Sequence, residues 1–156
     1  MLVSLRALAV LPVVAMSAIL VGCPGRGAQG DTGAGGSLAD TEGLFARLGG
    51  MDGVRALVDD LTARLAADER IQRFFVKTDF RRFKGRLVVQ LCALTGGPCR
   101  YGGSMADIHR GLAIKPQHFD AFMENVAASL TVVRLGARDR VELLKLLRQM
   151  KPDIAP

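Results

Sequence analysis

The sequence predicts an all-α protein with about four long helices and two or three short ones. Apolar side chains recur at helical spacing in four separate segments, no segment alternates apolar and polar residues over a useful length, and no internal repeat is present. The chain has 156 residues, of which 49% are hydrophobic and 23% are charged. This composition is sufficient for a single packed core of ordinary domain size.

The long helices are predicted, in chain order, by apolar residues spaced three or four positions apart. These residues are Val54, Leu57, Val58, Leu61 and Leu65; Phe80, Phe83, Leu87, Leu91 and Leu94; Phe119, Phe122, Met123, Val126 and Leu130; and Val141, Leu144, Leu147 and Met150. The second set ends before Gly96-Gly97-Pro98 and the fourth before Pro152, because proline cannot continue a helix. Shorter helical segments are expected at 43–48 and 105–111.

Residues 1–22 have the layout of a secretory signal peptide, with Arg6 near the front and an apolar run at 7–20. The run is shorter than the roughly 20 apolar residues of a spanning helix, so a transmembrane segment is the weaker interpretation. The sequence LVGC at 20–23 resembles a bacterial lipobox, which implies cleavage before Cys23 and a lipid anchor on its thiol. The alternatives are conventional cleavage further along and an uncleaved anchor. The expected location is the periplasmic side of the bacterial cell envelope.

Residues 23–40 are predicted to form a flexible tether, because six glycines and hardly any large apolar side chains follow Cys23. The folded domain is expected at 41–156. It contains Cys92 and Cys99, which lack the spacing of a zinc site or of covalent haem attachment. Export to an oxidising compartment would permit a disulfide between them. Two free thiols agree equally well with the sequence.

The sequence lacks the motifs on which several classes of function depend. The net charge of +6 comes from interspersed residues of both signs, so no nucleic-acid partner is expected. Paired catalytic carboxylates, a nucleophile elbow, a phosphate loop and a two-histidine zinc motif are all missing from the sequence. The two histidines are His109 and His118, and a lone histidine flanked by apolar residues is more often structural than a metal ligand.

A resemblance that covers most of the predicted folded domain changes the expectation for His109. Its parts are LFARLGG at 44–50, VDD at 58–60, FFVKTD at 74–79, GGP at 96–98, YGG at 101–103, MADIH at 105–109 and HFD at 118–120. In this order and spacing they resemble a group I truncated haemoglobin, the shortened globin that packs two helices over two around a haem. The resemblance implies a bound haem b and a diatomic gas ligand, O₂, NO or CO.

His109 matches the family's proximal histidine, whose ring nitrogen binds the haem iron and leaves the opposite side free for a ligand. Its other ring nitrogen is expected to donate to a backbone carbonyl. Phe75 matches the phenylalanine that packs on the haem face, and His118 is interpreted as structural. Within a basic cluster on the distal helix, Arg86 is the first candidate to bind a haem propionate and Lys84 the second.

The sequence departs from the family in the distal pocket. Thr62 and Leu87 stand where the group has a Tyr and a Gln that hydrogen-bond bound O₂, and Phe83 occupies a third distal position. Each lost hydrogen bond removes roughly 1 to 2 kcal/mol of O₂ stabilisation. The resemblance with these changes predicts an apolar site with fast O₂ release and good CO binding.

A binding protein is therefore favoured over an enzyme. The leading hypothesis is a globin that holds a diatomic gas reversibly at ferrous iron on His109. A second hypothesis is an NO dioxygenase or peroxidase-like detoxifying enzyme of the envelope, which requires an unknown redox partner. A third is a haem-free helical interaction domain that has kept only the fold.

Overall fold

The computed structural model describes residues 43–156; the predicted signal peptide, the lipidation site and the whole of the predicted tether lie outside them. The described residues form helices and no strand, which confirms the predicted class. The long helices are α3 (Gly50–Ala67), α4 (Phe80–Leu94), α6 (Pro116–Ser129) and α7 (Ala137–Arg148). The short helices are α2 (Leu44–Arg47), the 3₁₀ helix η1 (Gln72–Phe75), α5 (Met105–His109) and α8 (Lys151–Ile154).

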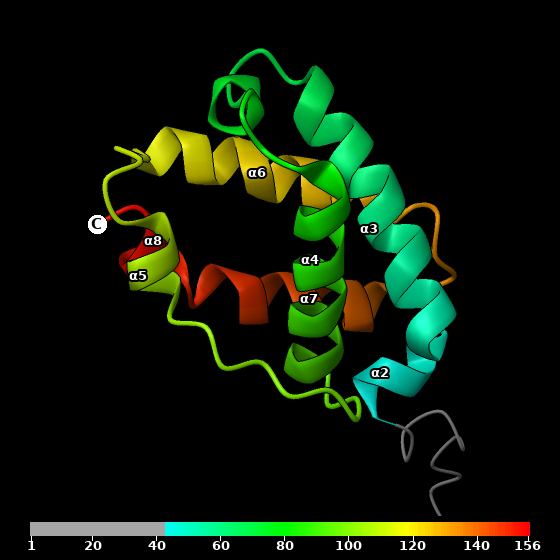
Figure 1. The fold of residues 1–156 in the computed structure, drawn as a ribbon. Helices are drawn as coiled ribbons and strands as arrows, with labels where there is room; N and C mark the ends of the chain where they lie inside the picture. Colours follow the sequence, from blue (N-terminus) through cyan, green and yellow to red (C-terminus); the bar gives the residue numbers. More distant parts are fainter. Residues whose placement is uncertain (1–42) are drawn as a thin grey trace, which may run out of the picture. The chain divides into compact units, whose positions relative to one another are not determined.

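The four long helices form two packed pairs. Helix α3 packs against α4 in one pair and α6 packs against α7 in the other, while α3 also crosses α6 and joins the pairs (Figure 1). This arrangement is the predicted packing of two helices over two. The short helices α5 and α8 lie against each other at one end of the molecule, and together they close one side of the space that the long helices leave (Figure 1).

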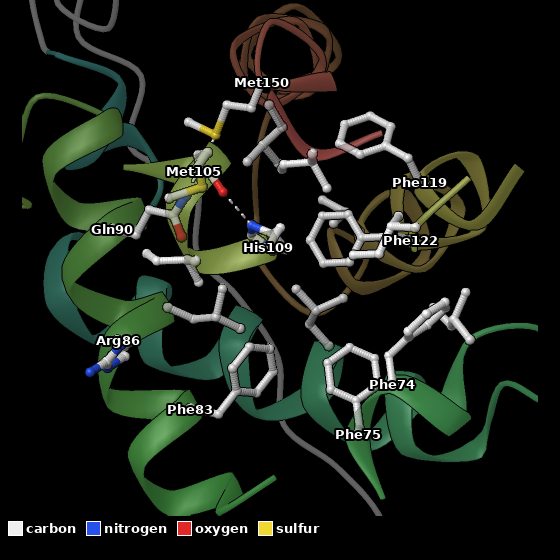
Figure 2. A pocket seen from close by; sticks show the side chains of 18 of the residues that line it. Phe74, Phe75, Phe83, Arg86, Gln90, Met105, His109, Phe119, Phe122 and Met150 are labelled. Carbon is white, nitrogen blue, oxygen red and sulfur yellow. Dashed lines mark hydrogen bonds between the residues drawn. The ribbon is translucent and has the colours of Figure 1, made fainter. Parts of the chain in front are cut away.

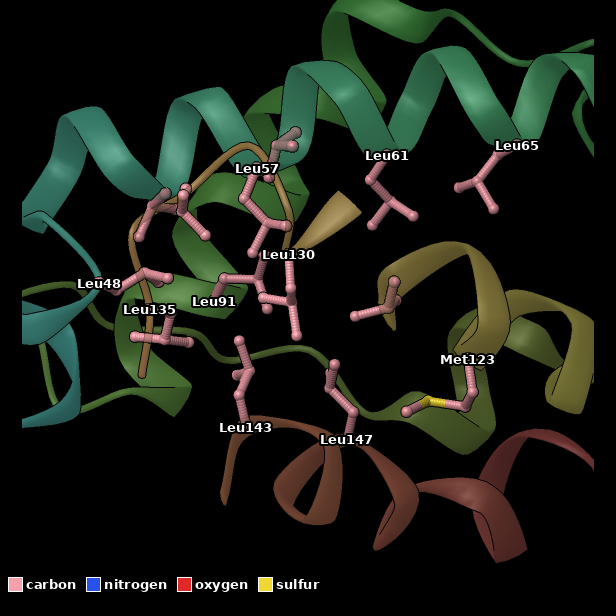
Figure 3. Packing of buried hydrophobic residues seen from close by; sticks show 14 of the residues in the cluster. Leu48, Leu57, Leu61, Leu65, Leu91, Met123, Leu130, Leu135, Leu143 and Leu147 are labelled. Carbon is pink, nitrogen blue, oxygen red and sulfur yellow. The ribbon is translucent and has the colours of Figure 1, made fainter. Parts of the chain in front are cut away.

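The core lies between these pairs, and α3 contributes one complete face to it. All five residues of its predicted apolar stripe are at most 2% exposed. Leu57, Leu61 and Leu65 point from this face toward Leu130 and Met123 on the opposite side (Figure 3). The spacing of apolar residues therefore predicted this helix and its buried side correctly.

One residue of the predicted apolar stripe of α7 lies outside the buried face. Val141 is 65% exposed, whereas Leu143 is fully buried. The helix begins at Ala137, four residues before the predicted stripe. Leu143 and Leu147, one turn apart, form the buried row beside the half-buried Leu144, and Val141 faces solvent on another side of the helix.

An ionic cluster ties the end of α3 to α6. The Asp68 carboxylate accepts hydrogen bonds from Asn125 Nδ2 at 2.6 Å and from Arg70 Nη2 at 2.8 Å. Arg70 also donates to Glu124 at 2.6 Å. The hydrogen bonds from Arg70, followed by that from Asn125, hold the pKa of Asp68 well below its usual range. The ionised carboxylate thereby fixes the corner that leads into η1.

Cys92 and Cys99 form a disulfide, with their Cα atoms 5.7 Å apart, so the structure selects one of the two alternatives that the sequence left open. The turn that it closes is tightly packed. A Cβ atom at Gly97 would lie 2.7 Å from Phe45 Cδ2 and 2.8 Å from Cys92 Sγ, so only glycine fits there. The backbone of this turn also accepts a hydrogen bond from Phe45 N at the Thr95 carbonyl, at 3.0 Å. The disulfide thus stabilises the corner between α4 and the loop to α5.

We expect the Cys92→Ser/Cys99→Ser double variant to lose about 2 to 3 kcal/mol of the free energy of unfolding, since closing a short loop restricts the unfolded chain. Urea denaturation measures this change. Wild-type protein in reductant is the matched control and should unfold at the same urea concentration as the double variant. An unchanged midpoint in both samples would show that the disulfide contributes no stability.

Candidate functional site

A cavity of about 300 Å³ opens between the helix pairs and the short helix α5. Its volume lies at the lower end of the range for small-molecule and cofactor pockets, roughly 300 to 1,000 Å³. The walls are mainly apolar and come from α3, α4, α6 and the segments at the end of the chain (Figure 2). Among the lining residues are Leu57, Leu61, Phe74, Phe75, Phe83, Leu87, Phe119, Phe122, Val126 and Leu147.

Aromatic side chains form one wall of the cavity. The ring centroids of Phe75 and Phe83 are 5.4 Å apart, and Phe80 lies 6.2 Å from each of them. Figure 2 shows Phe75 and Phe83 on the side of the cavity away from His109. The rings are tilted or edge-on to one another, and together they give this side of the cavity an apolar surface.

His109 lies on the cavity wall at the end of α5. Its Nδ1 atom is 2.8 Å from the carbonyl oxygen of Met105, one turn earlier in the same helix. A carbonyl oxygen can only accept, so Nδ1 carries the proton and donates, as the sequence analysis predicted. Nε2 is then the nitrogen with an unshared electron pair, and it makes no hydrogen bond with the described residues. The imidazole is therefore in the tautomer that binds a metal through Nε2.

The short helix α5 is held by the loop that precedes it. The Ser104 hydroxyl accepts a hydrogen bond from Asp107 N at 3.3 Å and caps the helix. At Gly103 a Cβ atom would lie 2.8 Å from both Ile108 Cδ1 and Tyr101 Oη, so the loop passes directly over the residue next to His109. Glycine at this position permits the close approach.

The other predicted site residues divide into two groups. Phe75, Phe83, Arg86 and Leu87 line the cavity, with the exposed Arg86 at its edge. Lys84 does not line it; its ammonium group donates to the Asp59 carboxylate at 2.7 Å, and its side chain is 40% exposed.

Thr62 belongs to the buried face of α3 and is not a lining residue. Its hydroxyl lies 2.8 Å from the carbonyl oxygen of Val58 and 3.1 Å from that of Asp59, both in the preceding turn of its own helix. A hydroxyl has one proton to donate, and that proton is used within the helix. The structure thus brings together four of the six predicted cofactor-binding residues, with His109 opposite them.

Sequence reasoning missed the polar and sulfur-containing residues of the wall. Gln90, Tyr101, Met105 and Met150 all line the cavity. For Gln90 a signal was available, since it follows Phe83 and Leu87 on the same face of α4 at helical spacing. Met150 comes from the far end of the chain, and only the tertiary structure brings it to the site.

His118 lines the opposite side of the cavity and caps α6. Its Nδ1 accepts from Lys115 N at 3.0 Å, its Nε2 lies 3.1 Å from Arg73 Nη2, and its ring is 5.0 Å from that of Phe74. Burial, followed by the charges of Arg73 and Lys115, lowers the pKa of His118. A neutral imidazole has one acceptor nitrogen, so only one of the two donors is bound at a time.

Together these features define a class of protein. The imidazole of His109, whose Nδ1 donates to a backbone carbonyl, lines a mainly apolar cavity, and a guanidinium stands at the cavity edge. This combination fits a planar metal-containing cofactor with carboxylate substituents, which is the chemistry of haem bound through a proximal histidine. Among residues 43–156, no cluster of three His, Cys, Asp or Glu side chains suited to a metal ion is present.

Residues 43–155 match the family model of bacterial-like globins, and the chain belongs to that family. Among curated proteins it is similar to a group 1 truncated hemoglobin of Tetrahymena pyriformis, with 34% identity over 71% of this chain and 93% of the relative. It is also similar to the group 1 truncated hemoglobin of Mycolicibacterium paratuberculosis, with 30% identity over 75% of this chain and 87% of the relative.

Solved structures agree with this assignment. The truncated hemoglobin from Tetrahymena pyriformis in its Fe(III) form superposes with a TM-score of 0.70 and 30% identity, covering 73% of this chain and 98% of that one. The 2/2 hemoglobin from Synechococcus gives a TM-score of 0.68 and 28% identity, covering 72% and 98%. The fold is that of a truncated globin, and membership of this family implies a haem cofactor.

We expect His109→Ala to abolish stable haem uptake, because it removes the imidazole that faces the cavity. The absorption spectrum of the protein expressed with haem, followed by titration of the purified apoprotein with hemin, measures this loss. His118→Ala is the matched control and should keep the Soret band. Unchanged uptake by His109→Ala would contradict the assignment of His109 as the iron ligand.

Proposed function

We propose that this protein holds haem b through Nε2 of His109 and binds a diatomic gas, O₂, NO or CO, reversibly at the opposite side of the ferrous iron. One observation carries the proposal. The Nδ1 hydrogen bond to the Met105 carbonyl leaves Nε2 of His109 with its lone pair at the wall of an apolar cavity. When bound, haem supplies an iron atom with one position open to a gas molecule.

The residues of the chain perform three tasks in this function. His109 ligates and orients the iron, and its hydrogen bond raises the basicity of the ring. Phe75, Phe83 and Leu87 exclude water from the opposite side of the cavity. Arg86, at the exposed edge, provides a guanidinium that can form charge-assisted hydrogen bonds with a propionate carboxylate. Lys84 is engaged by Asp59, so we assign the propionate contact to Arg86.

The ligand side of the pocket provides weak hydrogen bonding. The Thr62 hydroxyl donates within α3, and Leu87 has no polar atom. Bound O₂ carries partial negative charge and depends on a donor for slow release, whereas CO depends on one much less. The proposal is therefore a gas-binding protein with rapid O₂ exchange, and NO dioxygenation, which needs a long-lived O₂ complex, is disfavoured. The intact cavity and its histidine likewise disfavour a haem-free interaction domain.

We expect Leu87→Gln to slow O₂ release about 5- to 30-fold, the equivalent of roughly 1 to 2 kcal/mol for one added hydrogen bond. Stopped-flow displacement of O₂ by CO measures the rate. Thr62→Val is the matched control and should leave the rate unchanged, because it removes a hydroxyl that bonds only within its own helix. Faster release from Thr62→Val would show instead that this hydroxyl reaches the ligand.

We also propose that the domain is exported and attached to the envelope membrane by a lipid on Cys23, on its periplasmic side. The disulfide between Cys92 and Cys99 supports export, because such bonds persist in oxidising compartments. Within the described part of the chain, every helix is too short or too polar to cross a membrane.

Mass spectrometry of the protein from a bacterial host tests this attachment. We expect a mature chain that begins at an acylated Cys23, and no acylation in Cys23→Ser. Cys99→Ser is the control and should remain acylated. A mature chain that begins beyond Cys23 and carries no lipid would favour conventional cleavage and exclude the anchor.

A further inference from the structure

The helix that carries His109 has little support of its own. It has five residues, Met105–His109, and it packs chiefly against α8, which has four. Isolated helices shorter than about 12 residues are unstable in water, so the position of α5 depends on contacts with the rest of the molecule. The Met105 carbonyl that accepts from His109 belongs to the first residue of this helix. A contact with one of the long helices is therefore needed to hold this carbonyl in position.

Gln90 of the long helix α4 makes such a contact. Its Nε2 atom lies 3.4 Å from Sδ of Met105 and 3.5 Å from Sδ of Met150. The primary amide has two N–H groups, so it can donate to both sulfur atoms at once. Figure 2 shows the Gln90 amide next to the Met105 thioether, with the Met150 thioether beyond it and His109 nearby. One half-buried side chain thus links α4, the start of α5 and the residue that precedes α8.

Met105 links the Gln90 contact to His109, the proposed iron ligand. Its sulfur accepts from Gln90, and its carbonyl oxygen accepts from His109 Nδ1 at 2.8 Å. A partner of this kind fixes the tautomer and direction of a metal-binding histidine and adjusts its basicity. A movement of Met105 relative to His109 would lengthen or bend the hydrogen bond of His109.

We propose that Gln90 is a positioning residue for the iron ligand: through its N–H···S hydrogen bonds to Met105 and Met150 it holds the carbonyl that orients His109. This inference rests on the proposed function, since it assumes that His109 binds haem iron. A side chain that merely filled the space would be replaced without effect by an unbranched apolar residue. The N–H donors are the feature that distinguishes the two roles.

Gln90→Met is the decisive variant, because methionine has a similar length and flexibility and cannot donate. The full protein loaded with haem is reduced without added ligand, and resonance Raman spectroscopy measures the iron–histidine stretching frequency. We expect a lower frequency in Gln90→Met, since a looser Nδ1 hydrogen bond makes the ring less basic. We also expect haem to transfer to an excess of apomyoglobin roughly tenfold faster, the lower end of the usual effect of losing such a partner.

Matched variants separate positioning from general packing. Met105→Leu/Met150→Leu removes both sulfur acceptors and keeps the Met105 carbonyl, so it should reproduce the shift of Gln90→Met. Met123→Leu, in the core away from the cavity, and Gln117→Met, at an exposed position, should match the wild type in both measurements.

An unchanged stretching frequency and haem transfer rate in Gln90→Met would overturn the proposal and leave Gln90 a packing residue. A fall in the thermal stability of the apoprotein with no change in the Raman band would overturn it as well. Failure of the proposed function is a separate result: the iron–histidine band would then be absent from the wild type or would persist in His109→Ala. The two failures are therefore distinguishable.

Discussion

The hydrogen bond from His109 Nδ1 to the Met105 carbonyl determines what the cavity can hold. Without it the two tautomers of the ring would compete, and Nε2 would carry a proton in part of the molecules. With it, the lone pair on Nε2 of His109 is available at the wall of a mainly apolar cavity. The contacts of the Gln90 amide, the cap from Ser104 and the close approach at Gly103 all act on the short helix in which this bond is made.

The fold leaves a cavity beside its packed core. The α3 face and its partners across the core are buried to the usual degree, but the cavity next to them is surrounded by phenylalanine and leucine side chains. An apolar cavity lowers stability because its lining loses packing contacts. A flat apolar cofactor restores those contacts and binds only the folded state, so haem binding and stability are coupled. The ionic cluster at Asp68 and the disulfide stabilise two corners of the helical framework that surrounds the cavity.

Most of the fold could be predicted from the sequence, because helical periodicity is a local property. The stripe from Val54 to Leu65 gave both the helix and its buried face. Val141 was placed on the wrong side because the leucines at 143, 144, 146 and 147 allow more than one apolar row, and spacing alone does not decide which row the fold buries. In the site, the family resemblance located His109, Phe75, Phe83, Arg86 and Leu87 on or beside the cavity. It did not reveal that Thr62 bonds within its own helix, since hydroxyl rotation depends on the local backbone.

The sequence by itself determined the helical class, the order of the helices and the histidine to be sought at the cavity, His109, because these follow from periodicity and from short motifs in register. Only the tertiary structure decided that Cys92 and Cys99 are joined, that Lys84 is held by Asp59, and that Gln90 meets two thioethers. Each of these contacts joins two or more elements of the fold. Whether two side chains meet depends on the distances and orientations that helix packing sets, and residue spacing along the chain does not contain that information.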